Sequence, residues 1–88
     1  MGEPNANDSL REGLVARLAT GALPALNGQA WAGRASGDHR CACCLRPIAA
    51  GDMEYEPRDQ PGRYAHVRCF NVWLNESRRV ADLAIRSR

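Results

Sequence analysis

The sequence predicts a small α+β domain with one helix near each end and a short pair of strands between them. Three observations support this fold class. The chain has 88 residues, which suits one domain with a modest core. Apolar residues recur at helical spacing in two segments, and these flank a stretch where apolar and acidic residues alternate. Four cysteines in so short a chain indicate a cross-link that compensates for the small core.

The first predicted element is a helix over about residues 9–20, preceded by a disordered tail at residues 1–8. Ser9 and Glu12 fit a capping box at the start of the helix. Gly21 is suited to end it, because glycine readily adopts the left-handed conformation found there. The apolar face of this helix carries three leucines at helical spacing: Leu10, Leu14 and Leu18.

Residues 24–40 show no hydrophobic period and contain three glycines, so we expect a loop. Its one large apolar residue, Trp31, is expected to plug an edge of the core. Residues 9–40 thus form an N-terminal helix followed by a Gly-rich loop. Residues 41–88 form the second part of the same compact domain and contain most of the aromatic residues.

Residues 53–56 alternate apolar and acidic side chains, which predicts a half-buried strand with Glu54 and Glu56 facing solvent. Residues 57–62 are expected to form a hairpin loop and residues 63–65 the returning strand.

A long helix is predicted to start near Val67, since residues 66–87 contain neither Gly nor Pro. Its apolar stripe is expected to pack against the leucines of the first helix. The stripe begins with three large side chains: Phe70, Trp73 and Leu74.

Two pairs of metal-ligand residues flank the predicted hairpin. Cys41 and Cys44 have two residues between them, and so do His66 and Cys69. In a tight turn this spacing brings both sulfurs to one side, and at a helix start it places both side chains on one face. Thiolate and imidazole are the ligands that zinc prefers in structural sites. The sequence therefore predicts that these four residues bind one Zn²⁺.

Two further residues leave alternatives open. Cys43 could replace one of its neighbours as a ligand or act as a reactive thiol, although we expect neither. His39 could take the place of His66, but its position in a loop just before the first cysteine makes it the poorer candidate. The thiolate-rich site also has neighbouring cations that could donate to it from outside, namely Arg40, Arg46 and Arg68.

Beyond the ligand pairs, residues 41–48 read Cys-Ala-Cys-Cys-Leu-Arg-Pro-Ile and residues 66–73 read His-Val-Arg-Cys-Phe-Asn-Val-Trp. With Gly51 and Tyr55 between them, these segments resemble a treble-clef zinc finger of the LIM-like kind. They are also similar to small bacterial zinc-binding proteins of unassigned function. The resemblance implies a zinc knuckle, a short β-hairpin and a long C-terminal helix, but no substrate or partner. Such knuckles usually have glycine after the second cysteine, where this chain has Leu45.

The composition and net charge limit the classes of function that we expect for this chain. The net charge of +2 is too small to indicate a nucleic-acid or membrane partner by itself. No segment has the run of about 20 apolar residues that a membrane span needs, and no signal peptide is recognisable. We therefore expect a cytoplasmic protein. All basic residues are Arg and Ala is abundant, which suggests a GC-rich bacterial genome.

Four good ligands predict a closed zinc site, and no general-base motif accompanies them, so we do not expect an enzyme. The first hypothesis is a protein-interaction or regulatory module with an unknown protein partner, or one that self-associates. The alternative is nucleic-acid binding through the Arg-rich C-terminal helix. A third hypothesis is a thiol redox switch that uses Cys43 or releases zinc on oxidation. The arginines that would contact nucleic acid or a partner are Arg68, Arg78, Arg79 and Arg86.

Overall fold

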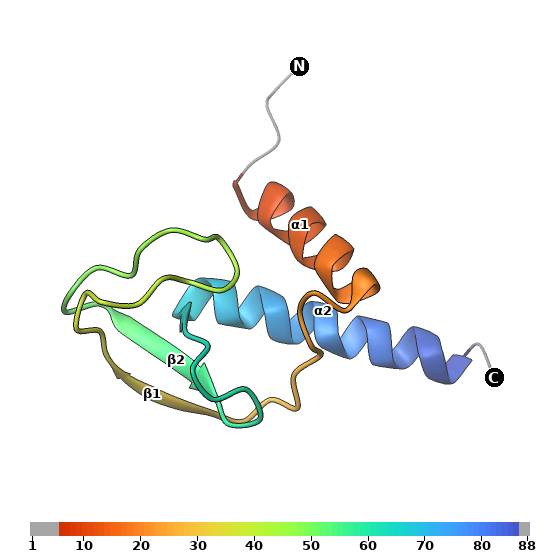
Figure 1. The fold of residues 1–88 in the computed structure, drawn as a ribbon. Coiled ribbons are helices and arrows are strands. Elements are labelled where there is room, and N and C mark those ends of the chain that lie inside the picture. Colours follow the sequence, from red (N-terminus) through yellow and green to blue (C-terminus); the bar gives the residue numbers. More distant parts are fainter. Residues whose placement is uncertain (1–5, 87–88) are drawn as a thin grey trace, which may run out of the picture.

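The computed structural model describes the backbone of residues 6–86 and the side chains of residues 8–82. The described residues form two helices and a small sheet, arranged as in Figure 1, which confirms the predicted α+β class. The elements follow in the order α1 (Ala6–Thr20), β1 (Ala30–Arg34), β2 (Met53–Pro57), β3 (Ala65–His66) and α2 (Val67–Arg86).

The sheet is antiparallel with strand order β1-β2-β3. Tyr55 in the central strand pairs with Ala32 of β1 and with Ala65 of β3. The pairing of β2 with β3 confirms the predicted hairpin, although β3 lies at Ala65–His66 rather than at residues 63–65. Helix α2 follows β3 without a connecting loop and starts at Val67, as predicted.

Strand β1 lies inside residues 24–40, where the prediction of a loop is wrong for Ala30–Arg34. The sequence of this strand has no apolar alternation because almost all of it is exposed on both faces, and backbone pairing with β2 holds it in place. Trp31 is 62% exposed, so its expected role as a core plug is also wrong. Figure 1 shows β1 at the outer edge of the sheet, away from both helices.

Helix α1 starts at Ala6, three residues before the predicted start. Ser9 lies within the helix, so the predicted capping box is wrong. Residues 1–5 of the expected tail lie outside the described residues. The predicted end of the helix is confirmed, because Gly21 follows Thr20 with a φ of 82°.

The core confirms that the apolar stripes of the two helices pack together. Leu14 and Trp73 are fully buried in one cluster, with Phe70 almost fully buried beside them. The Trp73 indole Nε1–H donates to the carbonyl oxygen of Pro24 at 2.9 Å. The Leu26 amide donates to the Ser77 hydroxyl at 3.0 Å. These two bonds connect the segment between α1 and β1 to α2.

The expected orientation of β2 is wrong: Glu54 is 8% exposed, whereas Met53 is 49% exposed. Both faces of the strand are covered near its centre. On one face the Tyr55 ring meets Phe70 of α2 edge-on, with 4.9 Å between the ring centroids. On the other face Glu54 accepts a hydrogen bond from His39 at 3.1 Å. A carboxylate can be buried here because a specific donor satisfies it.

Candidate metal centre

A tight turn at residues 40–47 carries Cys41 and Cys44. The Cys41 amide donates to the Arg46 carbonyl at 2.9 Å, and the Leu45 amide donates to the Cys41 carbonyl at 3.0 Å. Leu45 has a φ of 65°, the left-handed conformation that glycine adopts most easily. The turn therefore forms despite leucine at this position, and the Leu45 side chain is 58% exposed.

The second ligand pair lies where β3 passes into α2. His66 is the last residue of β3, and Cys69 lies in the first turn of α2. The Ala42 amide donates to the Tyr64 carbonyl at 2.7 Å, which joins the turn to the strand that leads to His66. This backbone hydrogen bond thus brings together the two ligand pairs, which are more than twenty residues apart in the sequence.

The four predicted ligands converge. Ligand atoms from Cys41, Cys44, His66 and Cys69 all lie within 4.8 Å of one another, and these residues could hold a metal ion. His66 Nδ1 lies 3.5 Å from the Cys44 sulfur and 3.8 Å from the Cys69 sulfur. A tetrahedral zinc site with metal–sulfur bonds of about 2.3 Å and metal–nitrogen bonds of about 2.0 Å has sulfur–nitrogen edges of about 3.5 Å. The donor set and its spacing therefore fit a zinc ion with Nδ1 as the histidine ligand.

Without a bound cation, Cys41 and Cys69 differ in the direction in which their pKa values are shifted. The pKa of Cys41 is far below its usual value, because Cys43 and then Cys69 donate hydrogen bonds to its sulfur. The same interaction with Cys41, together with burial, raises the pKa of Cys69. The cluster thus favours one thiolate and keeps Cys69 as a thiol. A bound cation would replace the Cys69 proton, so metal binding releases protons.

The two alternative ligands lie outside the cluster. Cys43 is 2% exposed, and its sulfur lies 3.6 Å from the Cys69 carbonyl oxygen. The hydrogen bond to Cys41 and burial raise its pKa, which opposes reactivity. His39 stacks on Tyr64 with ring centroids 3.6 Å apart. His39 therefore contacts Tyr64, which precedes β3, and Glu54 of β2, and it connects the start of the turn to the sheet.

Arg17 of α1 is a site residue that the sequence analysis missed. Its guanidinium donates to the Ala42 carbonyl at 2.8 Å and also to the Cys43 carbonyl. Arg17 is half-buried, whereas its neighbour Ala16 is exposed. The carbonyl of Gly13, one turn earlier, also accepts from Arg17 at 3.4 Å. Nothing in the local spacing of α1 distinguishes Arg17 from its exposed neighbours, so the sequence carried no signal for this role.

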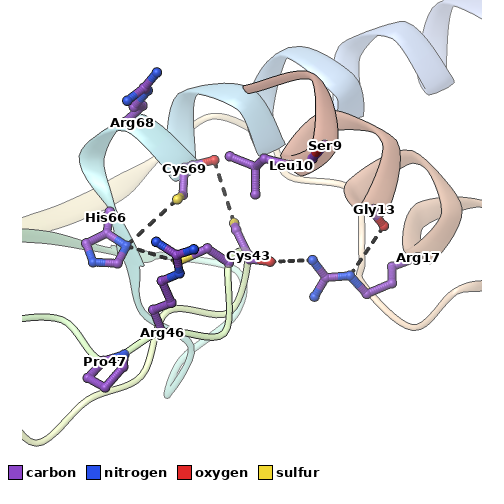
Figure 2. A pocket seen from close by; sticks show the side chains of 11 residues that line it. Ser9, Leu10, Gly13, Arg17, Cys43, Arg46, Pro47, His66, Arg68 and Cys69 are labelled. Atoms are coloured by element: carbon purple, nitrogen blue, oxygen red, sulfur yellow. Dashed lines mark hydrogen bonds between the residues drawn. The ribbon is translucent and has the colours of Figure 1, made fainter. Parts of the chain in front are cut away.

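A cleft of about 770 Å³ lies between α1 and the ligand cluster. Figure 2 shows Leu10 and Arg17 on the α1 side, with His66 and Arg46 across from them. Arg46 and Arg68 are exposed and line the cleft. Arg40 instead donates to the Leu45 carbonyl at 2.8 Å. Of the three arginines beside the ligands, one therefore supports the turn and two border the cleft.

The remaining arginines lie farther along α2. Arg79 lies 3.4 Å from the Glu76 carboxylate, and Arg78 is exposed. Arg79 is eleven residues from Arg68, or about 16 Å along a helix. The side chain of Arg86 lies outside the described residues. The structure thus distributes these predicted contacts along α2.

Comparisons with family models, curated proteins and solved structures find no match to this chain. Neither helix within residues 6–86 has the length and apolar character needed to cross a membrane.

Proposed function

We propose that this chain is a zinc-binding protein-interaction module with a structural Zn²⁺ and a treble-clef arrangement of ligands. The observation that carries the proposal is the convergence of three thiols and one imidazole within 4.8 Å. Four protein ligands close a tetrahedral site, whereas a catalytic zinc keeps one position for water. A structural zinc of this kind contributes about 10–16 kcal/mol to folding, which is large for a chain with so small a core.

The residues that line the cleft favour a binding role over a catalytic one. Two of the ligands, Cys44 and His66, are half-buried and line the cleft. Among the described residues, the lining contains no carboxylate and no second histidine that could serve as a general base. Its titratable groups other than the ligands are Cys43 and the arginines. We therefore propose a non-enzymatic role.

The lining also indicates the chemistry of the partner. Arg17, Arg46 and Arg68 contribute three positive charges, and the zinc site would contribute a net charge of about −1 by ligand counting. Leu10 and Pro47 add an apolar surface. An acidic protein segment with an apolar side chain complements this lining. We propose that such a segment of a partner protein binds in the cleft.

Metal content tests the zinc site. Elemental analysis of the purified chain should give one zinc per molecule, and Cys44→Ser should lose both the zinc and the cooperative unfolding transition. Cys43→Ser is the matched control, because its thiol lies outside the cluster, and it should keep the zinc. A well-folded chain without metal would refute the proposal, and so would zinc loss in the control alone.

Charge reversal tests the cleft. Proteins from the native cell extract would be captured on the zinc-loaded chain, on Arg46→Glu/Arg68→Glu and on Arg63→Glu. Arg63 is an exposed arginine of the loop before β3 and serves as the control. An acidic partner should bind the wild type and the control but not the double variant, and it should be released by chelator. Equal capture by all three proteins would refute this use of the cleft.

A further inference from the structure

We propose that the outer edge of β1 is a self-association surface, where two copies of the chain pair their β1 strands antiparallel about a two-fold axis at Ala32. The two three-stranded sheets would then form one continuous sheet. This surface includes neither the ligand cluster nor the cleft, so the proposal does not rest on the proposed function.

The backbone of β1 has polar groups free for such pairing. The Arg58 amide donates to the Gln29 carbonyl at 2.9 Å, and the Ala35 amide donates to the Asp52 carbonyl at 2.7 Å. Residues at odd positions therefore turn their backbone groups toward the β2 side. Because this direction alternates along a strand, Ala30, Ala32 and Arg34 turn theirs outward. β1 is the edge strand of the sheet, and no other described strand covers this side.

Antiparallel pairing about Ala32 uses all the outward groups. Ala32 lies opposite Ala32 of the second copy, and Ala30 lies opposite Arg34. These are the hydrogen-bonded positions of the new ladder, where facing residues exchange both N–H···O bonds. The register matches the five residues of β1 from end to end, so no outward amide or carbonyl of the strand remains unpaired.

The same register places Trp31 opposite Gly33 of the second copy, at a position without hydrogen bonds where side chains approach most closely. Nothing within one copy requires glycine at position 33. Its φ is not in the positive region, and an added Cβ would meet no atom within 4 Å. Glycine within a strand often marks the close approach of another group, and an aromatic ring opposite an edge glycine packs over its bare backbone. The exposed Trp31 supplies that ring.

The edge strand β1 also lacks the features that usually prevent an edge strand from pairing with another chain. Natural edge strands carry proline, lysine, a bulge or an inward-pointing charge to prevent pairing with another chain. β1 reads Ala-Trp-Ala-Gly-Arg, pairs with β2 in continuous register, and has one charge at its end. The net charge of +2 per chain produces little repulsion between two copies.

Sedimentation equilibrium of the zinc-loaded full chain tests the proposal. The dimer fraction should rise with concentration between about 1 µM and about 1 mM. Ala32→Pro removes an outward N–H while sparing the ladder to β2, and it should abolish the dimer. Trp31→Ser should weaken association about tenfold by removing two symmetry-related contacts. A chain that stays monomeric at about 1 mM would overturn the proposal, and so would a dimer that neither variant weakens.

Cross-linking tests the register. Opposed hydrogen-bonded residues have Cα atoms about 5.5 Å apart, within the range of a disulfide. Under mild oxidation Ala32→Cys should therefore form a covalent dimer. Arg34→Cys is the matched control, since its two copies would lie far apart, and it should give less than about a tenth of that yield. Equal yields from the two variants, above the background of the wild-type chain, would overturn the register.

Discussion

Arg17 links α1 to the metal-binding turn, and its replacement measures that link. In Arg17→Met the apolar stem of the side chain is kept, while the donors to the Ala42 and Cys43 carbonyls are lost. A hydrogen bond from a charged group contributes about 1.5 kcal/mol or more, so two give about 3 kcal/mol, and partial exposure of the guanidinium reduces this to about 2 kcal/mol. We expect that loss in the free energy of unfolding of the zinc-loaded chain.

Urea unfolding followed by circular dichroism gives this value. Arg11→Met is the matched control on the same helix. Arg11 is half exposed, and its ion pairs lie at 3.4 Å to Asp8 and 4.0 Å to Glu76. Its replacement should cost less than about 1 kcal/mol. Equal losses for the two variants would refute the conclusion that α1 supports the turn through Arg17.

Three further outcomes follow from the site. Leu45→Gly should raise the free energy of unfolding by about 1 kcal/mol, because it relieves a left-handed backbone, and no gain over Leu45→Ala would contradict this. His66→Asn should weaken zinc binding strongly. His39→Asn should keep one zinc per chain and only lower the melting temperature. Competition with a chelator measures the zinc affinity of both variants and distinguishes these outcomes. Zinc affinity should fall as the pH is lowered from about 8 to about 6, since the raised pKa of Cys69 means that a proton competes for its sulfur. An affinity that does not change over this pH range would contradict the expectation.

The sequence alone determined the α+β class, the start of α2 and the four residues that converge. These features are local. Ligand spacing, helical periodicity and the absence of Gly and Pro after His66 each depend on residues a few positions apart. The two apolar stripes were also predictable, because a helix in a small domain must bury its apolar face against another element.

Only the tertiary structure decided β1, the burial of Glu54 and the role of Arg17. Each depends on a partner distant in the chain: β2 for β1, His39 for Glu54 and the Ala42 carbonyl for Arg17. An edge strand held by backbone bonds needs no apolar alternation, so it leaves no periodic signal in the sequence. Likewise, a buried charge is stable only when a specific polar partner lies beside it. The residue type alone does not show whether the fold supplies such a partner.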